Sequence, residues 1–128
     1  MTVQVAVGVI INNKNQILIT KRSADQHQAN KWEFPGGKIE ASETAQQALA
    51  RELKEELGIQ LESADFLLTI HHQYKTKKVT LEVYEIRQWL GEPKGLEGQP
   101  MCWVEKHELK NYDFPTANAE ILSTLLVS

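Results

Sequence analysis

The chain has 128 residues, 41% hydrophobic and 24% charged, values typical of one globular domain with its own core. A net charge of −3 excludes a general electrostatic attraction to nucleic acid polymers or acidic membranes. The single Cys102 excludes an intrachain disulfide. The longest apolar run near the start, residues 5–11, is too short to span a bilayer and follows no basic leader. We therefore expect a single domain over residues 1–128, cytoplasmic and monomeric, without a membrane or nucleic acid partner.

The first third of the chain predicts two strands followed by a loop. Residues 3–11 are rich in valine and isoleucine, which favours a buried strand. Asparagines then supply a turn before a second predicted strand at residues 16–20. Residues 22–35 show no periodicity, so we expect a loop there.

The next element is a clearly indicated helix. Thr44 and Gln47 match a capping box, which marks a helix start, and Gly58 is a typical helix end. Between them, apolar residues recur every four positions: Leu49, Leu53 and Leu57. We expect this apolar stripe to pack against a sheet.

The second half predicts three strands and a final helix. Residues 66–74 and 79–89 are expected to form two strands joined by a lysine-rich hairpin tip. Residues 101–104 are expected to form a further, short strand. Residues 117–127 carry apolar side chains at helical spacing. Strands interrupted by one helix and closed by another predict an α/β sandwich with a mixed sheet.

Three glutamates, Glu52, Glu55 and Glu56, lie three and four residues apart near the end of the first predicted helix. Their charges repel one another, and the negative pole of the helix dipole disfavours them further. For the trio alone, a solvated helix face is the commoner explanation. The alternative is a bound cation that neutralises them, and carboxylate oxygens suit Mg²⁺ or Mn²⁺.

A longer pattern surrounds this trio and favours the metal. It reads Gly37-x5-Glu43-x7-Arg51-Glu52-Leu53-x-Glu55-Glu56-x-Gly58-Ile59. A chance match to its nine fixed positions is on the order of 10⁻⁷ per chain. The pattern resembles the signature of the Nudix hydrolases, which cleave nucleoside diphosphates linked to another group. This resemblance implies a Nudix-type α/β/α sandwich with a mixed β-sheet between helices.

The resemblance also implies roles for the signature residues. The three glutamates Glu52, Glu55 and Glu56 are expected to ligate Mg²⁺, or Mn²⁺ in its place, together with the carbonyl of Gly37. Arg51 is expected to hold the helix and loop in register through a charge-assisted contact with a carboxylate. Such metal ions neutralise phosphate oxygens and lower the pKa of a bound water.

Outside the signature, the chain is similar to the MutT subfamily of Nudix hydrolases. The matching segments are Ala6-Val7-Gly8, Thr20-Lys21-Arg22, Ala29-Asn30-Lys31, Glu33-Phe34-Pro35-Gly36-Gly37-Lys38, Gly91-Glu92-Pro93, Glu97-Gly98-Gln99-Pro100 and Asp113-Phe114-Pro115-x-Ala117-Asn118. The similarity implies hydrolysis of the small molecule 8-oxo-dGTP to 8-oxo-dGMP and pyrophosphate, by water attack at the β-phosphorus. It would keep oxidised nucleotides out of replication. The alternatives are another substrate, such as CTP or a pterin triphosphate, or a non-catalytic nucleotide sensor, which the intact signature disfavours.

Glu97 is expected to be a further metal ligand, by its resemblance to a subfamily carboxylate on a loop opposite the helix. From its local sequence alone, a glutamate in a glycine-rich loop is usually solvated. Either Glu52 or Glu97 could accept the proton of the attacking water. We expect Glu52 to be the primary base and Glu97 the second candidate.

Asn118 is the residue that we connect with specificity. Oxidation at C8 places a hydrogen on guanine N7, so the outer edge of the base offers one acceptor and one donor. An asparagine amide complements that pair with two hydrogen bonds. Its local sequence favours a helix cap, whereas the subfamily resemblance favours the binding role.

The remaining expected substrate contacts follow from the resemblance. They are Arg22 beside the nucleotide, Phe34 and Tyr74 as walls for the base, and Lys38 and Lys77 near the anionic substrate. Lys77 replaces a subfamily arginine, and lysine lacks the planar guanidinium that binds phosphate in two places.

Overall fold

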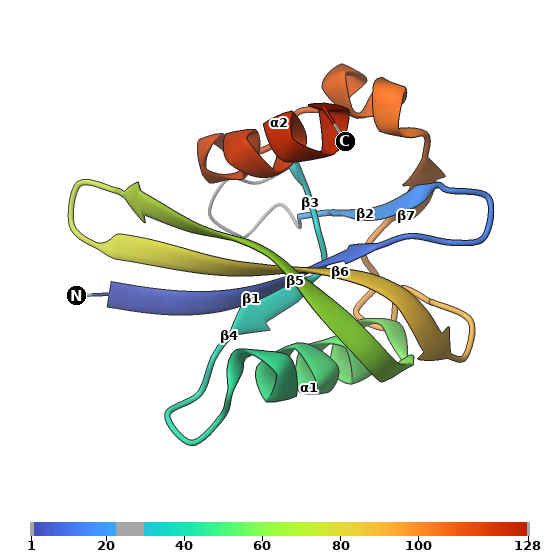
Figure 1. The fold of residues 1–128 in the computed structure, drawn as a ribbon, viewed down its shortest axis with the longest axis horizontal. Helices are drawn as coiled ribbons and strands as arrows, with labels where there is room; N and C mark the ends of the chain where they lie inside the picture. The colour runs from blue at the N-terminus through green and yellow to red at the C-terminus, as the bar shows by residue number, and fades with distance from the viewer. Residues whose placement is uncertain (1, 23–29, 128) are drawn as a thin grey trace.

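The computed structural model describes residues 2–22 and 30–127, which fold into a layered α/β structure (Figure 1). In chain order its elements are β1 (Thr2–Ile10), β2 (Ile17–Lys21), β3 (Trp32–Glu33), β4 (Gly36–Lys38), α1 (Ala45–Leu57), β5 (Gln60–Gln73), β6 (Lys78–Leu90), β7 (Met101–Val104), the 3-10 helices η1 (Lys106–Asn111) and η2 (Thr116–Asn118), and α2 (Ala119–Val127).

The strands form two sheets. The larger sheet has the order β4-β1-β6-β5, in which β1 runs parallel to β6 and the other pairs are antiparallel. The smaller sheet has the order β3-β2-β7 and is antiparallel. The predicted mixed sheet is therefore confirmed, but the chain crosses to a second sheet at the turn between β1 and β2.

Helices cover the sheets from opposite sides, with α1 below and α2 above in Figure 1. Leu49, Leu53 and Leu57 of α1 are fully buried in one core cluster. Ile121 and Leu125 of α2 are buried in the other. Each such side chain contributes roughly 1.5–3 kcal/mol by burial. This arrangement is the predicted sandwich.

The boundaries of α1 agree with the predicted signals. The Thr44 hydroxyl accepts from the backbone N of Gln47, and the Gln47 side chain accepts from the backbone N of Thr44. Gly58 has a φ of 69°, in the left-handed region that glycine adopts most easily, and its N–H donates to the carbonyl of Lys54. The helix therefore ends directly after the carboxylate cluster.

Several other predicted boundaries were wrong. The expected loop at residues 22–35 contains β3, while residues 23–29 lie outside the described part of the chain. β5 begins at Gln60 instead of residue 66, and its three register shifts interrupt the alternation that marks a strand. The last helix begins at Ala119, after a 3-10 turn. In the described residues, no helix is both long and apolar enough to cross a membrane.

Candidate active site

A cavity of about 850 Å³ opens between the larger sheet, α1 and the loops beside them. It gathers ten of the twelve predicted site residues from seven separate segments of the chain. These residues are Arg22, Phe34, Gly37, Lys38, Glu52, Glu56, Tyr74, Lys77, Glu97 and Asn118. Arg51 and Glu55 are not among the lining residues.

The acidic end of the cavity is formed by Glu52 and Glu56, one turn apart on α1. Burial, above all, raises the pKa of Glu56 to about 9, and a hydrogen bond with Glu52 and the negative charge of Glu52 add to this effect. The charges of Glu33 and Glu97 act in the same direction. Four carboxyl groups therefore concentrate negative potential at one place, which favours a cation there.

Glu55 points elsewhere. Its side chain is 55% exposed and lies 3.6 Å from the Arg51 guanidinium. Among residues 2–22 and 30–127, no three acidic, histidine or cysteine side chains are arranged so that they could hold a metal ion together. The expected ligation by Glu52, Glu55, Glu56, Glu97 and the Gly37 carbonyl therefore stays a prediction.

The backbone of Gly37 lies directly against the Glu52 carboxylate. A Cβ added at this glycine would clash with the carboxylate carbon and both of its oxygens. The Glu52 oxygens thus lie at the Gly37 backbone, where β4 faces α1, and carboxylate oxygens suit Mg²⁺ or Mn²⁺. The chemistry of the Glu52 carboxylate fits a divalent cation, although a complete set of ligands is not assembled among the described residues.

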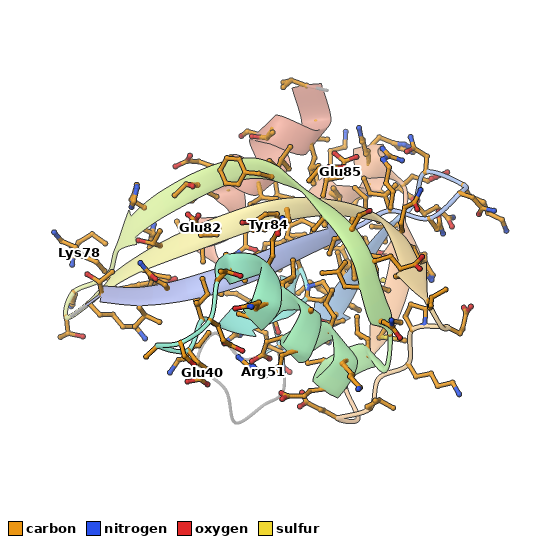
Figure 2. All side chains as sticks on the ribbon, turned by 60° about the horizontal axis from the view of Figure 1, so that its bottom comes forward. Glu40, Arg51, Lys78, Glu82, Tyr84 and Glu85 are labelled. Atoms are coloured by element: carbon orange, nitrogen blue, oxygen red, sulfur yellow. The ribbon has the colours of Figure 1, made fainter. Side chains whose placement is uncertain are left out.

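Arg51 ties the helix to the loop that precedes it. Its Nε and Nη2 donate to Oε2 and Oε1 of Glu43 at 2.7 and 2.9 Å, which confirms the expected charge-assisted contact. Nη1 donates to Oε1 of Glu52 at 2.9 Å, and Nη2 to the carbonyl of Lys38 at 3.1 Å. Figure 2 shows Arg51 close to Glu40 beside α1. Nη2 of Arg51 lies 3.9 Å from Oε1 of Glu40. The hydrogen bond from Arg51 lowers the pKa of Glu43 to about 2.

Aromatic and polar side chains also line the cavity. Phe34 is 4% exposed and stacks on Phe114, with 5.2 Å between ring centroids and 19° between planes. Asn118 is half-buried at the end of η2 and lines the cavity. η2 continues directly into α2, because Ala119 after Asn118 has helical backbone angles.

Glu33 is a lining residue that the sequence did not single out. It lies on β3, where Nη1 of Arg22 donates to its Oε1 at 2.6 Å. Burial raises the pKa of Glu33 more than the charge of Arg22 lowers it. Glu33 is the first residue of the matched segment at residues 33–38, and that match was the available signal.

Comparison with known proteins decides the family. A sequence profile described as the NUDIX domain matches residues 6–124. The chain belongs to the Nudix hydrolases. Its sequence is 45% identical over 122 residues to the 8-oxo-dGTP diphosphatase of Escherichia coli K12, covering 95% of both chains.

Other relatives agree with this membership. The 8-oxo-dGTP diphosphatase of Haemophilus influenzae is 45% identical over 124 residues, which are 97% of this Nudix chain and 91% of that protein. The CTP pyrophosphohydrolase of Escherichia coli K12 is more distant, at 31% identity over 94% of this chain and 89% of that one. A solved MutT structure, from work on Aliivibrio salmonicida and Vibrio cholerae, superposes with a TM-score of 0.85 at 33% identity, covering 98% and 97%. The predicted fold is confirmed.

Proposed function

We propose that this Nudix hydrolase converts 8-oxo-dGTP to 8-oxo-dGMP and pyrophosphate, and so removes an oxidised nucleotide before replication can use it. The observation that carries the proposal is a single cavity lined both by clustered carboxylates and by Phe34 and Asn118. The carboxylates suit a metal-bound triphosphate, and the aromatic ring and the amide suit a base. The names of the two relatives at 45% identity support the same substrate.

The metal-binding groups of this proposal are Glu52, Glu56, Glu97 and the carbonyl of Gly37, with Glu55 after a change of its side-chain conformation. A bound Mg²⁺, or Mn²⁺ in its place, would neutralise phosphate oxygens and make hydroxide available at neutral pH. Glu56 must lose its proton to act as a ligand, because ligands bind in their deprotonated form.

Glu52 is our choice for the general base. Its carboxylate lies at the Gly37 backbone, and Arg51 donates a hydrogen bond to one of its oxygens. Glu97 remains the second candidate, because its charge acts on Glu56 and Glu33 from the opposite loop. Four cationic residues line the cavity and would attract the anionic nucleotide: Lys21, Arg22, Lys38 and Lys77.

Base recognition belongs to Asn118, with Phe34 and Tyr74 as walls. Normal guanine would place its N7 acceptor against an amide acceptor, and such a buried mismatch costs about 1–3 kcal/mol or more. We propose that the substrate is a free nucleotide and not part of a nucleic acid polymer, in keeping with the net charge of −3. We also propose that the protein is a monomer in the cytoplasm, where a single unpaired cysteine is common.

The test measures kcat/KM for 8-oxo-dGTP, dGTP and CTP with Mg²⁺. We expect a preference of at least about a hundredfold for 8-oxo-dGTP, since a site that pairs with a polar group discriminates strongly against its absence. Similar efficiency with dGTP would refute the oxidised-guanine specificity, and a preference for CTP would favour the activity named for the more distant relative. Glu52→Gln is expected to abolish turnover, and unchanged turnover would refute the mechanism.

A further inference from the structure

Glu97 lies on the loop between β6 and β7, outside every helix and strand. No regular backbone ladder holds its carboxylate at the cavity. Its position relative to Glu52 and Glu56 on α1 therefore depends on contacts between this loop and the helix.

The side-chain amide of Gln99 makes one such contact with both of its polar atoms. Nε2 donates to the backbone carbonyl of Glu56 at 3.1 Å, and Oε1 accepts from the backbone N of Glu97 at 2.9 Å. A single amide thus connects the backbone of a cavity carboxylate on α1 with the backbone of a cavity carboxylate on the loop.

The end of α1 explains why the loop docks there. The last carbonyls of a helix lack partners within it. The carbonyls of Leu57 and Glu56 accept from the backbone N–H groups of Lys94 and Leu96, both at 3.0 Å. Gln99 supplies a second donor to the Glu56 carbonyl, so the loop replaces the missing turn of helix.

The position of the amide is itself restricted by the loop. The N–H of Gly98 donates to the carbonyl of Gly95 at 3.0 Å, which closes a tight turn. A Cβ added at Gly95 would clash with the backbone carbonyl oxygen of Gln99. The turn therefore fixes where the Gln99 backbone lies relative to α1.

We infer that Gln99 is a positioning residue that holds Glu97 at a fixed place opposite the carboxylates of α1. This inference rests on the proposed function, because it assumes that Glu97 takes part in turnover. Bridging these two backbones needs a donor and an acceptor on one side chain. Leucine has a similar size and provides neither, so Gln99→Leu removes the bridge.

A double-mutant cycle with Glu97→Gln tests this inference. We expect Gln99→Leu alone to lower kcat about tenfold or more with little change in KM, because displacing a catalytic group costs more than the hydrogen bonds themselves. In the Glu97→Gln background, the same substitution should change kcat by less than about twofold. Equal losses in both backgrounds, or no loss in either, would overturn the inference.

Titration with Mn²⁺ in the presence of 8-oxo-dGMP provides a readout that does not depend on turnover. Gln99→Leu and Glu97→Gln are expected to change the Mn²⁺ affinity by the same factor. Different factors would mean that Gln99 does not act through Glu97.

Gln46→Leu is the matched control. The Gln46 amide also donates to a backbone carbonyl, that of Ala64 at 3.3 Å, but on an exposed part of α1 outside the cavity. We expect kcat and Mn²⁺ affinity to stay unchanged in this variant, and a loss like that of Gln99→Leu would overturn the inference.

A second route keeps the test decisive if Gln99→Leu does not fold. Gly95→Ala leaves the Gln99 side chain intact but displaces the turn that carries it. Gly95→Ala then replaces Gln99→Leu in the double-mutant cycle. We expect it to lower kcat in the native protein and to change kcat very little in the Glu97→Gln variant. If the unmodified protein does not hydrolyse 8-oxo-dGTP, the proposed substrate is wrong, and the cycle can be repeated on the nucleotide that it does cleave.

Discussion

Asn118 is the single residue on which substrate discrimination depends in our proposal. We expect Asn118→Ala to lower kcat/KM for 8-oxo-dGTP by about a hundredfold and to change that for dGTP much less, because two hydrogen bonds to the oxidised edge are lost. Asn111→Ala, at an exposed position on η1, is the control and should keep the native ratio of the two values. Steady-state kinetics with both nucleotides measure the ratio. If Asn118→Ala retains the native ratio, another residue reads the base.

The carboxylates show how far residue-level sequence reasoning reaches. Spacing along α1 places Glu52 and Glu56 on nearly the same side, 40° apart, whereas Glu55 is rotated by about 60° from Glu52. Glu52 and Glu56 accordingly line the cavity, and Glu55 lies in solvent near Arg51. Glu33 was part of a matched segment, but it was not assigned a role, because a lone glutamate has no spacing pattern that indicates a metal ligand or a binding residue. Its burial comes from the folding of distant segments around it.

At the scale of elements, the pairing of Arg51 with Glu43 joins α1 to the loop before it. The pKa of Glu43 is lowered from 4.5 to about 2, chiefly by the hydrogen bond from Arg51. A carboxyl with a lowered pKa stabilises the folded state above its unfolded pKa, and this stabilisation is lost as the pH falls toward the folded pKa.

Glu43→Gln tests this linkage. We expect the variant to unfold more easily than the native protein at pH 7, and the difference in the free energy of unfolding to shrink as the pH falls from about 5 to 2. Urea unfolding at a series of pH values measures the difference. Exposed Glu120→Gln on α2 serves as the control and should show a small difference at every pH. A difference for Glu43→Gln that does not depend on pH would contradict the linkage.

Elements with local signals could be predicted, and those without them could not. α1 has a capping box, an apolar stripe and a terminal glycine, all of which lie within 15 residues of one another, and it was predicted at both ends. β3 and β4 have two and three residues, too few for any alternation to be visible. They exist because they pair with β2 and β1, which are distant partners that no local pattern reveals.

At the scale of the whole molecule, the same limit applies to the sheets. Periodic apolar segments predicted a sandwich, since each of them must bury one face against another layer. The division into two sheets depends on which strands pair, and β2 pairs with β7 across about eighty residues of chain. Such long-range pairing follows from the packing of the complete fold. The cavity forms where these distant segments meet, and its predicted lining residues came mostly from the family resemblance, because no local periodicity connects them.

Because the proposed ligands come from α1, the Gly37 backbone and the Glu97 loop, they are assembled only in the folded chain. A metal that binds the folded state alone stabilises it by about 2.7 kcal/mol at one hundred times its dissociation constant. We therefore expect saturating Mn²⁺ to raise Tm by several degrees, and EDTA to reverse the rise. Glu52→Gln should remove most of this shift, whereas Glu62→Gln, which removes an exposed charge on β5 away from the cavity, should keep it. Differential scanning calorimetry measures all three proteins, and an equal shift in Glu52→Gln would exclude Glu52 as a ligand.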